Sequence, residues 1–123
     1  MTLDVPLRIV VSICALTVAA GVLDSLAFTY SASIWQTGRI SWLHVAKAGS
    51  AFFLGIVMYW LSLRYLSAVG VVLPEIQTLI WFMATIAGVT LLSGRLGAWS
   101  AVDQLAGVCA LVSLGWLITR TSA

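Results

Sequence analysis

The sequence predicts an all-α membrane protein of four transmembrane helices that assembles as a dimer. Hydrophobic residues make up 62% of the chain and charged residues only 8%, and the mean hydropathy is +1.10. A water-soluble domain with this composition would have almost no polar face. The 123 residues allow roughly four helices with short connections, because each crossing needs about 20 apolar residues. We therefore expect a single transmembrane domain covering residues 1–123.

The first apolar segment predicts a helix over about residues 7–30, interrupted only by Asp24. A positive charge before a hydrophobic stretch can mark a cleaved signal peptide. This stretch is long for such a signal, however, and no A-x-A cleavage site closes it. We expect a helix that is retained in the mature protein.

Three further apolar segments predict helices over about residues 42–66, 69–92 and 101–117. The polar or glycine-containing stretches SASIWQTGRIS, SAVG and SGRLGAWS separate the four segments. Because SAVG is so short, we expect the second and third helices to be antiparallel neighbours. Tryptophan side chains prefer the membrane interface, and they flank these segments at Trp35, Trp42, Trp99 and Trp116.

Asp24 and Lys47 are expected at comparable depth, one near the end of the first helix and the other near the start of the second. An ion pair between them would offset the insertion cost, which is about 2.5–3.5 kcal/mol for a charge at a helix centre. We interpret the pair as a bridge between the helices or a gate, and the alternative is a substrate or proton site. Asp103 falls in the first turn of the last helix, where the helix dipole favours an acid.

Glu75 is the acid for which a binding role is predicted. It is expected roughly 9 Å inside a helix that starts at residue 69, and Pro74 would loosen that helix and require a protein-lined or wet cavity. A carboxylate in such a cavity can bind a cation or exchange protons. The alternative is an acid that reaches the headgroups and pairs with Arg64 or Arg120.

Gln77, Thr78 and Trp81 complete the predicted substrate-binding set with Glu75, because they add hydrogen-bonding and aromatic surface to the same helix. We expect Thr78 and Trp81 to lie close together on the helix surface, and Gln77 to be turned away from Trp81.

Small residues recur at four-residue spacing on all four predicted helices. In lipid, such spacing lets helix backbones approach closely. We favour packing inside one protomer over a dedicated dimer face. The sets are Thr17, Gly21 and Ser25; Ala51 and Gly55; Ala84 and Gly88; Ala106 and Ala110; Cys109 and Ser113.

The basic residues leave the membrane orientation undecided. Four crossings place three of them on each side, and the positive-inside rule needs an excess on one side. Insertion in both orientations as an antiparallel pair is one outcome; the alternative is that a partner or the first helix decides. The two sets are Arg8, Arg64 and Arg120 against Arg39, Lys47 and Arg95.

Other function classes receive no support from the residues. Cys14 and Cys109 lie in apolar runs as packing residues, and His44 has no neighbours at metal-ligand spacing. A net charge of +2 is too small to suggest nucleic acid. No nucleophile lies beside a base, so we expect neither an enzyme nor a cofactor or metal.

Residues 58–123 resemble the four-helix units of the drug/metabolite transporter superfamily, of the small multidrug resistance and EamA-like types. The resemblance rests on YWLSLRYLSAVGVVLPEIQTLIWF and LLSGRLGAWSAVDQLAGVCALVSLGWLI, in which SGRL takes the place of the family's stop after the third helix. It implies a transporter subunit in a bacterial inner membrane. Such a subunit works as a homodimer, in parallel or antiparallel arrangement, or with a related four-helix subunit.

The chain departs from this family in its first helix. Small multidrug resistance proteins carry a glutamate halfway along that helix, where this sequence has only ICALTVAAGVL. Asp24 comes too late to replace it. The resemblance therefore implies movement of a small metabolite, a cationic compound or a lipid-linked sugar, without specifying the coupling. The alternative is an accessory subunit that packs in a larger membrane complex and transports nothing.

Overall fold

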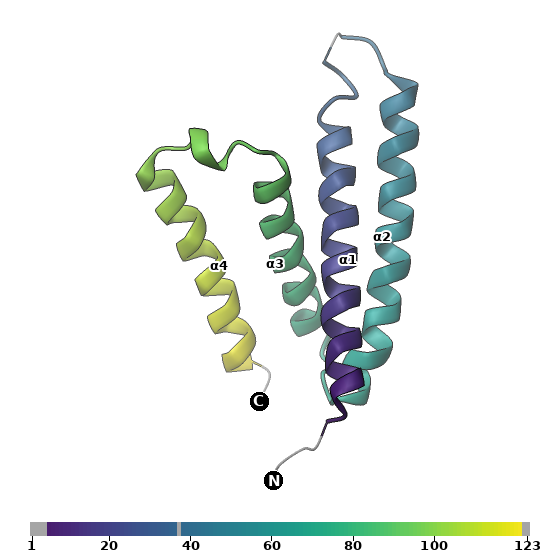
Figure 1. The fold of residues 1–123 in the computed structure, drawn as a ribbon, viewed down its shortest axis with the longest axis vertical. Helices are drawn as coiled ribbons and strands as arrows, with labels where there is room; N and C mark the ends of the chain where they lie inside the picture. Colours follow the sequence, from purple (N-terminus) through teal and green to yellow (C-terminus); the bar gives the residue numbers. More distant parts are fainter. Residues whose placement is uncertain (1–4, 37, 122–123) are drawn as a thin grey trace.

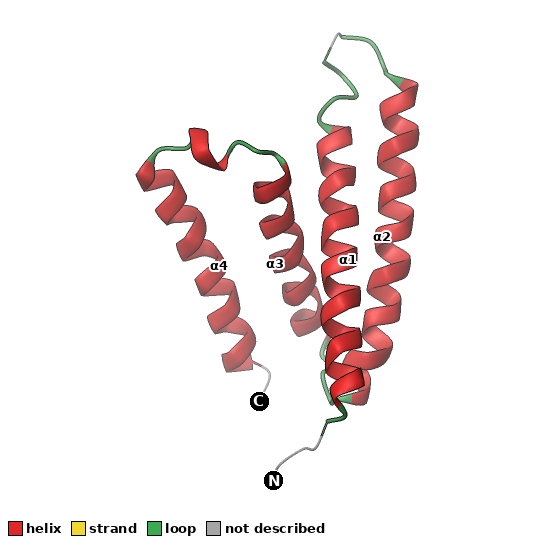
Figure 2. Ribbon diagram, in the orientation of Figure 1, coloured by secondary structure: helices red, strands yellow, loops and turns green. Residues whose placement is uncertain are grey.

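The computed structural model describes residues 5–36 and 38–121, which form helices joined by turns, without a strand in these ranges. The helices are α1 (Leu7–Ser31), α2 (Trp42–Ala68), α3 (Pro74–Leu92) and α4 (Ala101–Thr121), with a short 3₁₀ helix η1 (Leu96–Ala98) before α4. They run alternately up and down (Figures 1 and 2). Each of the four long helices is long and apolar enough to cross a membrane, as in a multi-pass membrane protein.

The core of the molecule lies where α1 packs between α2 and α3. Its buried apolar residues are mostly alanines, which allow the helices to approach closely. A Cβ added at Gly21 of α1 would lie 2.9 Å from the Cβ of Ala84 in α3, so this contact requires glycine. The small-residue sets of α1, α2 and α3 thus serve packing within the chain, as predicted.

The third helix begins five residues later than predicted, at Pro74 instead of residue 69. Gly70 has a φ of 86° and turns the chain after α2. Leu73 is extended (φ −73°, ψ 123°), as the residue before a proline tends to be. Pro74 therefore occupies the first helical turn, where its missing N–H costs nothing, and it does not loosen the helix.

Helix α4 packs mainly against α3 and lies apart from α1 and α2 (Figure 1). No residue from 101 to 120 is buried. Its start is held locally, because the Ser100 hydroxyl donates to the Asp103 carboxylate (2.7 Å) and accepts from the Asp103 N–H (3.2 Å). Asp103 thus has the helix-terminal role expected for it.

The start of α1, the end of α2 and the end of α4 lie at the same end of the molecule, near both termini in Figure 1. Arg8, Arg64 and Arg120 belong to these three segments. The grouping of basic residues on which the orientation argument depends is therefore confirmed for these three.

Candidate functional site

Asp24 is a carboxyl group completely enclosed by three helices. Its exposed fraction is 0%, and its Oδ1 lies so close to Gly55 of α2 that a Cβ at that position would clash with it. Gly55 lies midway along α2, 13 residues from each end. The acid therefore lies level with the middle of a membrane-spanning helix, where charge is most costly.

The two oxygens of the Asp24 carboxyl group differ in their hydrogen bonding. Oδ2 accepts a hydrogen bond of 2.5 Å from Nε1 of Trp81 in α3. Oδ1 is buried without a hydrogen-bond partner. An unpartnered buried acceptor costs about 1–3 kcal/mol, and this cost would be relieved by a proton on the carboxyl group or by a positively charged partner.

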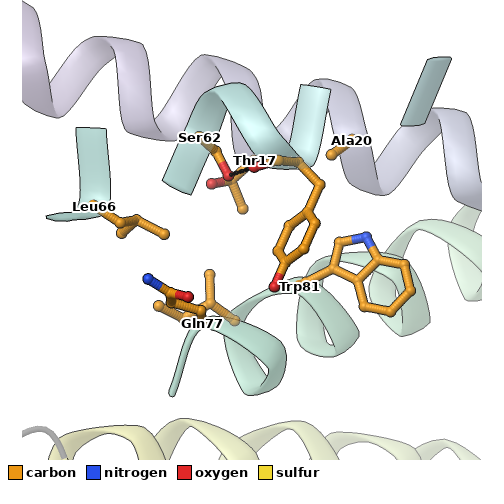
Figure 3. Close-up of a pocket in the computed structure, with 8 residues that line it drawn as sticks. Thr17, Ala20, Ser62, Leu66, Gln77 and Trp81 are labelled. Carbon is orange, nitrogen blue, oxygen red and sulfur yellow. Dashed lines mark hydrogen bonds between the residues drawn. The ribbon is translucent and has the colours of Figure 1, made fainter. Parts of the chain in front are cut away.

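A small cavity of about 10 Å³ lies next to Trp81, enough for about one water molecule. Figure 3 shows Thr17 and Ala20 of α1 and Ser62 and Leu66 of α2 across from Gln77 and Trp81 of α3. Tyr59 and Ile80 complete the lining. The ring centroids of Tyr59 and Trp81 are 5.5 Å apart, so two aromatic rings border this cavity, and one of them, Trp81, also contacts Asp24.

A second polar contact between α1 and α3 lies one residue further along α1. The hydroxyl of Ser25 lies 2.5 Å from the Gly21 carbonyl and 3.1 Å from the Thr85 carbonyl. The Thr85 hydroxyl itself is buried and has no hydrogen-bond partner. Two buried polar atoms of the described residues, Oδ1 of Asp24 and the Thr85 hydroxyl, therefore lack a hydrogen-bond partner, and the first of them lies against Gly55 of α2.

Gln77 and Trp81 come together as lining of one cavity, and the expectation that Gln77 is turned away was wrong. Four residues make little more than one helical turn of 3.6 residues, so the two share a face. The Gln77 amide donates to the Val71 carbonyl (3.0 Å) and so steadies the turn before α3. Thr78 donates to the Pro74 carbonyl (2.7 Å) and does not line the cavity.

Glu75 is exposed in the first turn of α3, so the depth of 9 Å expected for it was wrong. The error follows from the late start of α3 at Pro74. At this position the helix dipole stabilises an acid without any enclosed site. The reason for placing substrate at Glu75 was its depth, and that reason is gone.

The predicted ion pair of Asp24 with Lys47 is absent, although both residues lie in the described part of the chain. Asp24 lies against Gly55, which is eight residues, or about 12 Å, further along α2 than Lys47. The Lys47 ammonium lies over the ring of Tyr30 at 5.6 Å instead. The two residues are therefore at different depths, because Asp24 lies two turns before the end of α1.

Sequence reasoning identified Asp24 and Trp81 separately, but not their contact, and it missed Tyr59 and Ser62. Gly55 was noted only for its size. The small-residue set of Thr17, Gly21 and Ser25 was the available signal, since it marks the face of α1 that carries this site and indicates that α3 approaches it closely.

The chemistry open to this arrangement is binding of a proton or a cation, because a buried carboxylate with one unpartnered oxygen attracts positive charge. Within residues 5–36 and 38–121 no group of three His, Cys, Asp or Glu side chains could hold a metal ion. No known protein family, curated protein or solved structure matches the chain. The resemblance to drug/metabolite transporters therefore stays a prediction.

Proposed function

We propose that this chain is one subunit of a dimeric membrane transporter of the drug/metabolite type, in which Asp24 binds a proton and a cationic substrate in turn. The observation that carries the proposal is the buried carboxyl group with one unpartnered oxygen, level with the middle of α2. A structural acid would be expected to have both oxygens satisfied. Glu75 is exposed and does not line the cavity beside Trp81, so the proposal does not include it.

Cationic compounds are favoured over the other substrate classes by the buried carboxylate and by the rings of Trp81 and Tyr59, which line the small cavity. Trp81 holds the carboxylate through its indole N–H, and Tyr59 packs against Trp81. Aromatic faces attract cations by about 0.5–2 kcal/mol, most strongly away from water. The cavity of about 10 Å³ is too small for an organic cation, so binding requires α3 to move away from α1 and α2.

A dimer is supported by the contrast between α4 and the other helices. The small residues of α1, α2 and α3 are used within the chain, whereas Ala106, Ala110, Cys109 and Ser113 of α4 are all exposed. The cavity beside Trp81 has a volume of only about 10 Å³, too small for a substrate to pass between the helices of one subunit. A second subunit against α4 would provide the missing wall.

The exposed α4 also favours the second candidate, an accessory subunit whose α4 packs against a different membrane protein. In that case Asp24 would only join α1 to α3. The two candidates differ in what the purified chain does alone, since only the first predicts transport.

The test is uptake of tetraphenylphosphonium, a cation of suitable chemistry, into vesicles that contain the purified chain and have an imposed pH gradient. We expect Asp24→Asn to lower the uptake rate at least about tenfold, which corresponds to about 1.4 kcal/mol. Glu75→Gln and Asp103→Asn are matched controls, because they remove exposed acids, and they should retain the wild-type rate. If the Asp24→Asn variant takes up the cation at the wild-type rate, the proposed role of Asp24 is wrong. Absence of uptake by a wild-type chain that also forms no dimer would favour the accessory subunit.

A further inference from the structure

A second hollow lies at the end of the molecule that holds the start of α1 and the end of α2. Its volume is about 340 Å³, within the range of sites that hold small molecules. It is separate from the cavity beside Trp81, with which it shares no residue. The lining residues are Arg8, Ile9 and Ser12 of α1 and Arg64, Tyr65 and Ala68 of α2.

The two guanidinium groups that line this hollow have no acidic partner in the described part of the chain. Arg8 and Arg64 accept hydrogen bonds only at their backbone carbonyls, from the Ser12 and Ser67 hydroxyls, and no ion pair, hydrogen bond or ring contact joins either guanidinium group to another described residue. Arg120, at the same end of the molecule, differs because it stacks on the Trp116 ring at 5.2 Å. Two positively charged residues thus line one hollow without an ion-pair partner among residues 5–36 and 38–121.

The depth of this hollow in the membrane indicates which kind of anion can reach it. Arg8 is the second residue of α1, and Arg64 lies four residues, or about 6 Å, before the end of α2. Headgroup phosphates lie at this depth when α1 and α2 cross a bilayer. Guanidinium groups bind phosphate through paired N–H donors, and basic pockets between transmembrane helices bind acidic lipid headgroups.

We propose that Arg8 and Arg64 together bind the phosphate group of one anionic phospholipid, whose acyl chains lie along the apolar surfaces of α1 and α2. The site does not depend on the transport proposed above. It would fix a lipid to the α1–α2 pair at the end of the molecule near the N-terminus.

Native mass spectrometry of the purified full chain in detergent, titrated with phosphatidylglycerol, tests this site. We expect Arg8→Gln and Arg64→Gln each to weaken lipid retention about fivefold, the equivalent of about 1 kcal/mol for each arginine. Because both residues contact one phosphate, the double variant should lose less than the product of the two single losses. Arg64→Lys should retain the charge but recover only part of the affinity, since lysine lacks the paired donors.

Arg120→Gln is the matched control, because it removes a positive charge from the same end of the molecule outside the hollow. It should keep retention within about twofold of wild type. A loss as large as that of Arg8→Gln would overturn the proposal in favour of diffuse attraction to acidic lipid. Equal retention of zwitterionic phosphatidylcholine would also overturn it, and so would loss of the lipid at an equimolar concentration of inorganic phosphate, which would identify free phosphate as the ligand. Circular dichroism of each variant checks that the helices are intact, and wild-type retention by a folded Arg8→Gln, Arg64→Gln double variant would rule the site out.

Discussion

The indole Nε1 of Trp81 donates a hydrogen bond of 2.5 Å to Oδ2 of Asp24, which lies 57 positions earlier in the chain. The bond joins α1 to α3 at the level where Gly55 of α2 also contacts the acid. One interaction therefore fixes the carboxyl group among three helices and leaves its Oδ1 without a partner. In the transport proposed above, the separation of α3 from α1 would stretch or break this bond.

Trp81→Phe should lower the free energy of unfolding by about 1–3 kcal/mol. The substitution keeps an aromatic ring in place but leaves both oxygens of Asp24 buried without a donor. The measurement is an SDS titration of the protein in mixed micelles, followed by circular dichroism. Trp60→Phe is the control, since Trp60 is 64% exposed and its loss should change the free energy little. Equal effects of the two substitutions would mean that the indole N–H does not stabilise the buried acid.

Gly55→Ala should destabilise the protein and impair cation uptake together. The added Cβ would clash with Oδ1 of Asp24 and push α2 away from α1, at a cost of about 1–3 kcal/mol. Gly49→Ala is a matched control in the same helix, because a Cβ there meets nothing within 4 Å. That control should be neutral or slightly stabilising, since alanine favours the helix. If Gly55→Ala has the wild-type free energy of unfolding in the SDS titration and the wild-type rate in the uptake assay, the contact between Gly55 and Asp24 has no role in stability or uptake.

Thr85→Val should leave stability unchanged or raise it, contrary to the usual effect of altering a buried residue. The Thr85 hydroxyl is buried without a hydrogen-bond partner, so replacing it by a methyl group of similar size removes an unsatisfied polar atom. The backbone carbonyl of Thr85 still accepts from Ser25. An SDS titration that shows a loss of more than about 1 kcal/mol would mean that the hydroxyl has a partner such as a water molecule.

The helices were predictable because their signals are local. Apolar runs of the required length, separated by glycine and polar residues, give the bounds of α1, α2 and α4 to within a few residues of those observed. The start of α3 was missed because hydropathy does not register backbone geometry. Residues 71–73 are as apolar as the helix that follows, and only Gly70 and Pro74 mark the extended connection between α2 and α3.

The site was predicted only in part because its contacts depend on the register between helices. Gln77 and Trp81 were both predicted as substrate-binding residues of the third helix. The acid that contacts Trp81 is Asp24 of α1, and the hydropathy pattern does not indicate which residues of α1 lie level with Trp81. Antiparallel register places Asp24 against Gly55 and Lys47 near Tyr30. Two charges of opposite sign near the same loop were therefore a misleading signal for an ion pair.

Double-mutant cycles on Asp24 distinguish this register from the one expected for an ion pair. Asp24→Ala combined with Lys47→Met should be additive within about 0.3–0.5 kcal/mol of unfolding free energy, because residues that share no contact do not couple. Asp24→Ala combined with Trp81→Phe should show a coupling of about 0.5–3 kcal/mol, since each substitution removes the same hydrogen bond. Lys47→Met alone should lower the free energy of unfolding by about 0.5–1 kcal/mol, because the contact of Lys47 with the Tyr30 ring is lost. In a Tyr30→Leu background, Lys47→Met should have no such effect. If the cycle with Lys47 shows the larger coupling, the carboxylate and the ammonium meet in the folded protein, and the acid belongs to an ion pair near the α1–α2 loop instead of a site shared with α3.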